Sequence, residues 1–253
     1  MQAHPVFPST GDQPQAEATP SRLIIDAPTR MFHWLFALSF VGAYLTADSE
    51  NFRLLHVTLG YTMAGLLVFR VLYGLFGPRQ ARLGVLWRKL TGLPAWLRSV
   101  RTAPSLSAVN GRPAQNLLMA LAVFALLAMV VPLTLSGYAT YNDWGDFLGG
   151  DWLEEVHEFF GEAFLFVVLV HLALILLLSL LRRKNQAAPM FTGRAEGTGP
   201  SLVVNNRAWL ATLLLLAVLA YGAWEWQNSP SGLVSAQALS SFTAAEDRDH
   251  DDD

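Results

Sequence analysis

The sequence predicts an all-α fold, an integral membrane helix bundle with a four-helix core and a fifth transmembrane helix. Of the 253 residues, 53% are hydrophobic and only 15% are charged. Soluble domains carry about 25% charged residues, and a transmembrane helix needs ~20 mostly apolar ones. Runs that approach this length occur at about 31–47, 54–76, 116–140, 155–181 and 208–226.

The first run is interpreted as a helix and not as a cleaved signal peptide. A long polar segment rich in Pro, Gln and Ala precedes it, and cleavage after the run would remove His33. The chain contains no cysteine. Disulfides, thiolate metal ligands and covalently attached c-type haem are therefore excluded.

Basic residues concentrate in two connecting loops, after the second and the fourth run. They are Arg79, Arg82, Arg88, Lys89, Arg98, Arg101 and Arg112, then Arg182, Arg183 and Lys184. Short basic loops face the cytoplasm. We therefore expect a multi-pass protein of the bacterial inner membrane, with its N-terminus in the cytoplasm and its C-terminus in the periplasm. The opposite loops are acidic, which fits solvated loops or a docking surface for a basic partner.

Composition divides the chain into five parts. A polar segment predicted to be disordered comes first, then the four-helix core, a Gly- and Pro-containing irregular linker, the fifth transmembrane helix and an acidic periplasmic tail. In that order, the five parts span residues 1–21, 22–184, 185–206, 207–226 and 227–253. Within the core, residues 78–113 space tryptophans among arginines, which suggests a segment lying in the membrane interface.

Four histidines lie in or at the ends of the predicted helices. His157 and His171 are fourteen positions apart, a spacing that climbs ~21 Å and returns to nearly the same helix face. With alternating helix directions, His56 falls at the outer depth of His157, and His33 at the inner depth of His171. The sequence thus predicts two histidine pairs at two depths.

Two such pairs suit two non-covalently bound b haems, each iron taking one imidazole from each of two helices. Gly60 and Gly161 follow His56 and His157 by four residues, and a missing side chain there lets a macrocycle lie against the helix. Close helix packing explains these glycines equally well, and a hydrogen bond between helices explains a single histidine. A zinc site is a weaker alternative, because further Asp, Glu or Cys ligands are lacking.

Haem propionates need cations near each surface. Arg53 is the candidate at the outer haem, and Arg30 and Arg70 are the candidates at the inner one; snorkelling of Arg70 to lipid headgroups is the alternative. Quinone chemistry needs a proton donor or acceptor near a haem edge. The sequence offers Tyr138, Glu158 and Glu162 for this purpose.

Several segments resemble the bacterial cytochrome b561 family, which is similar to the b-type subunits that anchor nickel-iron hydrogenases and formate dehydrogenases. They are DAPTRMFHW, HVTLGYTMAGLLVFRVLYGLFGPR and YATYNDWGDFLGGDWLEEVHE, together with the second histidine of the fourth helix. The resemblance covers about residues 22–195. The fifth helix and the acidic tail depart from the shortest members of the family.

The resemblance implies a four-helix core with two b haems, ligated by His33 and His171 on the inner side and by His56 and His157 on the outer side. It also implies electron transfer between the membrane quinone pool and a periplasmic redox partner such as a c-type cytochrome. Membrane lipid is the surrounding partner, and no nucleic acid is expected.

Other functions stay open from the sequence. The chain is either an electron-transfer protein or a subunit of a quinone-linked oxidoreductase, and no catalytic residue is assigned, because both axial positions of each iron would be filled. A second candidate is a membrane anchor whose haems relay electrons for a hydrogenase- or dehydrogenase-type complex. A third is a haem-free transporter, although few polar residues lie in mid-span.

Overall fold

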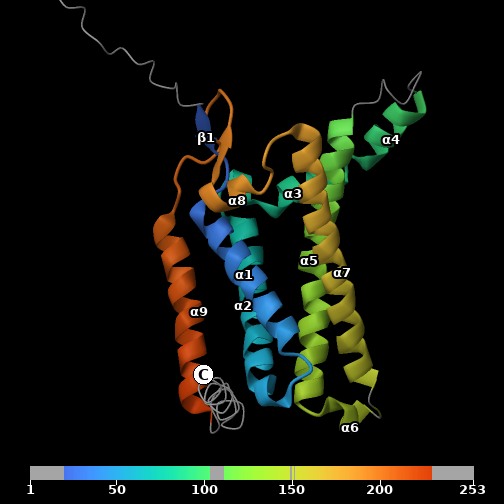
Figure 1. The fold of residues 1–253 in the computed structure, drawn as a ribbon, viewed down its shortest axis with the longest axis vertical. Coiled ribbons are helices and arrows are strands. Elements are labelled where there is room, and N and C mark those ends of the chain that lie inside the picture. The colour runs from blue at the N-terminus through green and yellow to red at the C-terminus, as the bar shows by residue number, and fades with distance from the viewer. Residues whose placement is uncertain (1–19, 103–110, 149, 151, 230–253) are drawn as a thin grey trace, which may run out of the picture.

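A computed structural model of the chain describes residues 20–102, 111–148, 150 and 152–229. Long helices run side by side (Figure 1), which confirms the predicted helical membrane bundle. These helices are α1 Ala27–Leu45, α2 Arg53–Phe76, α5 Gly111–Tyr141, α7 Trp152–Arg182 and α9 Ala208–Asn228. The predicted disordered segment and acidic tail fall almost entirely outside the described residues.

Helices long and apolar enough to cross a membrane are α2, α5, α7 and α9. The remaining long helix, α1, has 19 residues, and its first half contains Arg30, His33 and Trp34. These polar groups keep α1 below the hydropathy of the other four, although it runs beside α2 in the bundle (Figure 1).

Shorter elements lie at the two ends of the bundle. Strand β1, α3, α4 and α8 gather at one end and α6 lies at the other (Figure 1). The short helices are α3 Leu83–Leu90, α4 Leu93–Thr102, α6 Trp144–Leu148 and α8 Ala188–Thr192; the 3-10 turns are Glu50–Phe52 and Arg79–Ala81; and the strands are β1 Ser21–Leu23 and β2 Arg194–Glu196.

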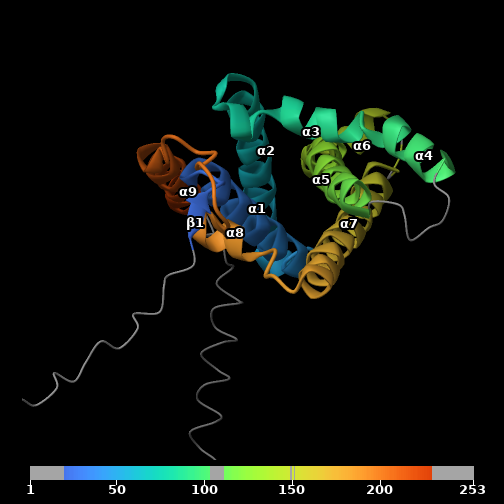
Figure 2. The same cartoon turned by 90° about the horizontal axis from the view of Figure 1, so that it is seen from above.

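The core consists of two helix pairs. Helix α1 packs on α2 and α5 packs on α7, and the pairs meet chiefly through α2 and α5, while α9 packs on α1 outside the core (Figure 2). The backbones of α1 and α7 approach each other much less closely. Side chains of these two helices therefore reach toward each other across the interior.

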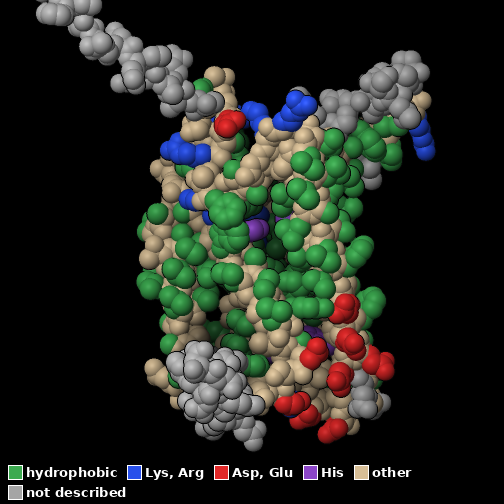
Figure 3. Space-filling view, in the orientation of Figure 1, with side chains coloured by type: hydrophobic (Ala, Val, Ile, Leu, Met, Phe, Trp, Pro, Cys, Tyr) green, Lys and Arg blue, Asp and Glu red, His purple; other side chains and the backbone are tan. Residues whose placement is uncertain are grey.

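Charge separates along the bundle axis. Basic residues gather at the end that carries α3 and α4, and acidic residues at the end that carries α6 (Figure 3). We call these the basic end, with Arg88, Lys89, Arg101 and Arg182, and the acidic end, with Glu50, Asp146, Glu154 and Glu155. This is the separation that the sequence predicts for the two faces of a membrane.

Helix α1 begins at a buried carboxylate. Asp26 is the N-cap, and its Oδ1 accepts a hydrogen bond from the backbone N–H of Thr29 at 3.2 Å. The hydroxyl of Tyr73 in α2 donates to Asp26 Oδ2 at 2.5 Å, and Asp26 is only 1% exposed. A residue that caps one helix and binds the next fixes the start of α1 against the end of α2.

The linker between α7 and α9 is more ordered than the predicted irregular segment. Gly193, with φ +76°, ends α8, and β2 then pairs antiparallel with β1, with Arg22 opposite Ala195. The backbone N–H of Leu202 also donates to the carbonyl of Leu23 at 2.9 Å. We call residues 188–206 the linker cap, because they cover the start of α1.

Asp26→Ala should destabilise the protein, because it removes the helix cap and leaves the Tyr73 hydroxyl without its acceptor. We expect a loss of about 1–3 kcal/mol and a lower melting temperature in detergent. Tyr73→Phe keeps the cap and should cost less. A melting temperature unchanged by Asp26→Ala would contradict this account of the cap.

Candidate metal centres

The structure brings His56 and His157 together at the acidic end. His56 lies in the first turn of α2 and His157 in the second turn of α7. Their ring centres are 5.9 Å apart and their planes are nearly perpendicular, at 86°. Two imidazoles on opposite sides of one metal ion have ring centres roughly 6 Å apart, given metal–nitrogen distances of about 2 Å. The pair thus has the separation of two axial ligands.

Backbone carbonyls fix the protonation of both rings. His56 Nδ1 lies 2.8 Å from the carbonyl oxygen of Ala43 in α1, and His157 Nδ1 lies 3.0 Å from that of Leu133 in α5. A carbonyl oxygen can only accept, so Nδ1 carries the proton in each ring. The lone pair of Nε2 is then free for a metal, which is the usual arrangement of a metal-bound histidine.

His157 reaches its carbonyl because position 137 has no side chain. A Cβ atom added at Gly137 would lie 2.7 Å from Cε1 and 3.0 Å from Nδ1 of His157. The hydroxyl of the neighbouring Ser136 lies 3.3 Å from the same Nδ1. Sequence reasoning missed Gly137, and only its place in a helix facing a candidate ligand could have indicated it.

His33 and His171 form a second pair toward the basic end, on α1 and α7. The two helices also meet near the middle of the bundle through Phe40 and Phe164. The Nδ1 atom of each is buried and has no hydrogen-bond partner among the described residues. Buried polar atoms are rarely left unpaired, so this pair is incomplete without a further group.

An apolar layer separates the two pairs. Phe164 lies midway between His157 and His171 on α7, and its ring centre is 4.6 Å from that of Phe40 in α1. Met63 follows His56 by two helical turns and packs in the same cluster, together with Val130 and Leu133 of α5. Histidine side chains are visible at two heights of the bundle in Figure 3. The two candidate sites are therefore distinct, with a dry layer between them.

The glycines predicted to face a flat group border open space. A Cβ atom added at Gly60 or Gly161 would meet no atom within 4 Å. Close helix packing, the alternative considered from the sequence, would have placed a neighbouring atom there. Both glycines lie one turn beyond a histidine of the acidic-end pair and leave room for a macrocycle.

The cations predicted near the sites differ in their surroundings. Arg53 is 59% exposed at the acidic end, lies 4.0 Å from Glu50 and stands over the Tyr141 ring. Arg30 donates through Nη1 to the carbonyl of Phe191 at 2.8 Å, while its buried Nε has no hydrogen-bond partner among the described residues. The buried Nε of Arg22, which was not a candidate from the sequence, likewise has no partner within the part of the chain that the structure describes.

The three residues considered for proton transfer do not form one cluster. Glu162 accepts a hydrogen bond from the Tyr44 hydroxyl at 3.0 Å, and Tyr138 stacks edge-on against Trp144. Glu158 forms no side-chain hydrogen bond or ion pair with the residues that the structure describes. Arg70, the other cation predicted near the inner site, donates through Nη1 to the carbonyl of Ala81 at 3.0 Å.

No group of three or more His, Asp or Glu side chains within the described parts of the chain could hold a metal ion. A closed tetrahedral zinc site needs four such ligands. The histidine pairs therefore fit a metal whose other ligands come with a cofactor, as in haem.

The chain matches the prokaryotic cytochrome b561 family over residues 24–193. It belongs to that family. Searches of curated proteins and of solved structures gave no match. As a family member, this cytochrome is a multi-pass bacterial membrane protein that binds b-type haem and transfers electrons, in agreement with the resemblance seen in the sequence.

Gly137→Ala should disturb haem binding by this cytochrome, because the added methyl group pushes the His157 ring away from the Leu133 carbonyl. We expect lower haem content and altered electron paramagnetic resonance signals of the ferric haem in the purified protein. Gly222→Ala is a matched control, since a Cβ there in α9 meets no atom within 4 Å. Equal haem content and identical signals in both variants would refute this role of Gly137.

Proposed function

We propose that this cytochrome binds two b haems and transfers electrons between the quinone pool and a periplasmic redox partner such as a c-type cytochrome. The observation that carries the proposal is the pair of histidine sites at two heights of the bundle. In the acidic-end pair, the ring centres lie 5.9 Å apart, and both Nδ1 atoms bond to backbone carbonyls, which leaves the Nε2 lone pairs for a metal. Bound haem supplies an iron that cycles between the ferrous and ferric states.

The chain's own residues hold and insulate that iron. The bonds from His56 and His157 to backbone carbonyls orient both imidazoles and strengthen them as ligands. If two imidazoles held each iron, a bound haem would supply electron transfer and would have no open position for a substrate. Phe40 and Phe164 are buried in the apolar cluster between the sites, and this cluster would give both haems a low-dielectric surrounding.

We assign the remaining site residues by position. Arg53 is proposed to pair with propionates at the acidic end and Arg30 at the basic end, where the described residues offer its Nε no partner. Gly60 and Gly161 are proposed to lie against the acidic-end haem, because both border open space. His33 and His171 are proposed as the axial ligands of the other haem.

The charge separation supports an orientation. Basic loops face the cytoplasm, so the basic end is proposed to lie on the cytoplasmic side and the acidic end on the periplasmic side. The acidic-end haem then lies nearest a periplasmic partner, with Glu154 and Glu155 in the adjacent first turn of α7.

Replacement of one ligand should remove one haem. We expect about two b haems per chain in the purified protein and about one in His56→Ala or in His171→Ala, because each iron needs both imidazoles. A pyridine haemochrome assay with a protein determination measures this ratio. His250→Ala, outside the described residues, is the control and should keep both haems; a ratio unchanged by His56→Ala would refute the pairing.

Quinol reactivity in isolation separates this function from a subunit that only relays electrons. Purified wild-type protein should be reduced by a quinol without any partner. A protein that purifies only with an enzyme subunit and is not reduced by quinol would instead be the anchor of a hydrogenase- or dehydrogenase-type complex. Helix α9, which the structure describes over its full length, offers such a subunit a surface outside the core, because Ala211 is the one residue of this helix that is buried.

A further inference from the structure

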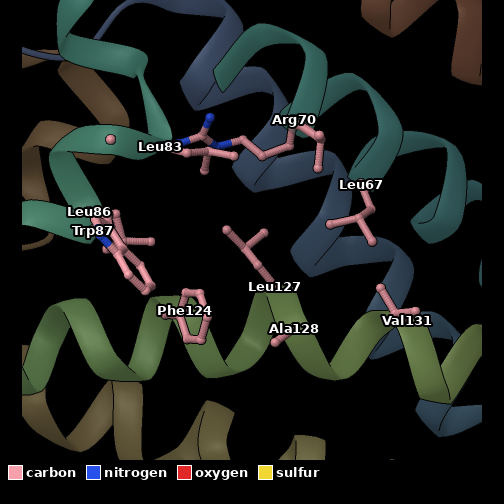
Figure 4. Close-up of a pocket in the computed structure, with 11 residues that line it drawn as sticks. Leu67, Arg70, Leu83, Leu86, Trp87, Phe124, Leu127, Ala128 and Val131 are labelled. Carbon is pink, nitrogen blue, oxygen red and sulfur yellow. The ribbon is translucent and has the colours of Figure 1, made fainter. Parts of the chain in front are cut away.

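An apolar groove of about 360 Å³ lies between α2, α3 and α5. Ten of the eleven residues that line it are uncharged. Figure 4 shows Trp87 of α3 beside Phe124 of α5 at one end, and Leu67 of α2 and Val131 of α5 at the other. Phe124 and Val131 are seven residues apart, which is about 10 Å along α5. This groove, which we call the α3 groove, therefore follows two turns of a membrane-spanning helix.

The α3 groove is open to the surroundings of the bundle. Trp87 is 61% exposed, Val131 47% and Phe124 41%, although all three line the groove. Helix α5 is long and apolar enough to cross a membrane, so its exposed apolar side chains contact lipid tails, which are as apolar as leucine. An acyl chain can therefore enter the groove sideways from the bilayer.

Helix α3 closes the groove at the basic end and is held in place by the chain itself. It extends from the end of α2 toward α5 (Figure 2) and packs on both helices. Nη1 of Arg70 in α2 donates to the carbonyl of Ala81, just before α3, at 3.0 Å. Leu83 of α3 fills the space that a side chain at Gly74 would need, since a Cβ atom there would lie 2.5 Å from Leu83 Cγ. The groove is thus a formed site and not a gap between loosely placed helices.

Helix α3 has an apolar face and a basic face. Leu83 and Trp87, one turn apart, line the groove, while Arg88 and Lys89 in its last turn are exposed. A short helix of this kind lies in the membrane interface, with its apolar side toward the acyl chains and its cations at the level of the headgroups. The same helix therefore presents hydrocarbon to the groove and positive charge to the lipid phosphates beside it.

The positive charge around α3 has no acidic partner within the described residues. Both ion pairs found there lie elsewhere, between Arg53 and Glu50 and between Lys184 and Glu196. Basic pockets beside membrane-spanning helices bind the headgroups of anionic lipids. Residues 79–102 contain no Asp or Glu and six basic residues, which are Arg79, Arg82, Arg88, Lys89, Arg98 and Arg101.

We infer that the α3 groove binds one anionic phospholipid, with an acyl chain along the groove and its phosphate beside Arg88 and Lys89. Arg70 lines the groove and uses one of its five N–H donors for Ala81, so further donors are available for the ester oxygens of the lipid. A zwitterionic phospholipid offers the same chains but no net charge. The inference is independent of the proposed function, because none of these contacts involves a candidate haem ligand.

A lipid in this position would join the two helix pairs of the core. The pairs meet chiefly through α2 and α5, and these two helices form the walls of the groove. A ligand that binds only the folded state stabilises it. An anionic phospholipid should therefore raise the melting temperature of the purified protein in detergent more than a zwitterionic one does.

Lipid titration of the purified protein tests the inference. Delipidated protein in detergent is titrated with dioleoyl phosphatidylglycerol, or with dioleoyl phosphatidylcholine, which has the same acyl chains and no net charge. Native mass spectrometry measures the fraction of protein that carries one lipid, and haem content is measured in parallel. We expect the wild type to bind phosphatidylglycerol at least tenfold more tightly than phosphatidylcholine, because only the former supplies the missing negative charge.

Two double variants test the headgroup contact. Arg88→Gln with Lys89→Gln removes the cations at the end of α3 and should weaken phosphatidylglycerol binding by about tenfold or more. Arg183→Gln with Lys184→Gln is the matched control, because it removes the same charge just after α7, from residues that do not line the groove. The control should keep the wild-type affinity, and all variants should keep the wild-type haem content.

Filling the groove tests the acyl-chain contact. A Cβ atom at Gly84 meets no atom within 4 Å and this residue lines the groove, so Gly84→Phe should occupy it and weaken phosphatidylglycerol binding by about tenfold. Gly222→Phe adds the same side chain at an equally open position of α9 and should match the wild type. In the wild type, phosphatidylglycerol with a photoactivatable acyl chain should label peptides that contain residues 83–90 or 124–131 more than those of α9.

Several results would overturn the inference. Equal affinity of the wild type for the two lipids would mean that bulk lipid covers the groove. Equal weakening in both double variants would reduce the effect to general attraction, and wild-type affinity in Gly84→Phe would place the lipid elsewhere. A quinone retained in the groove in place of a phospholipid would also overturn it. A chain that binds no haem would instead refute the proposed function and leave the lipid site standing.

Discussion

The interior of this cytochrome depends on histidines that must present a lone pair inside hydrocarbon. An imidazole buried there has a second nitrogen that needs a partner, and leaving it unpaired costs on the order of 2 kcal/mol or more. His56 and His157 satisfy this need with carbonyls of the neighbouring helices, from Ala43 and Leu133. Each bond fixes the register of one helix pair, α1 on α2 and α5 on α7. Gly137 follows from the same constraint, because the His157 ring occupies the space of its missing side chain.

The spacing of the apolar layer follows from the positions of the ligands. Phe40 lies two turns after His33, Met63 two turns after His56, and Phe164 two turns from both His157 and His171. Seven residues return nearly to the same helix face, so residues at this spacing face the same interior as the ligands. Layers of polar ligands and of apolar side chains therefore alternate along the bundle axis.

The sequence predicted the helical bundle, and also that His56 and His157 lie at one depth, where their ring centres are 5.9 Å apart, because both depend on simple periodicities. Apolar runs of membrane-spanning length have few alternatives to a helix, and helix direction alone sets the depth of each histidine. The carbonyl partners of His56 and His157 could not be predicted, since every residue has a carbonyl and only packing selects Ala43 and Leu133. The sequence did not predict the linker cap. Gly193, Gly197 and Gly199 indicate turns, but they do not indicate that β2 pairs with β1.

The linker cap has a consequence for biosynthesis. Strand β2 is made about 170 residues after its partner β1, or roughly 10–35 s later at 5–20 residues per second. Until then, the carbonyls of Met190 and Phe191, which accept hydrogen bonds from Trp34 and Arg30, are absent. The basic end next to His33 therefore gains this cover only after α7, which carries His171, has been made.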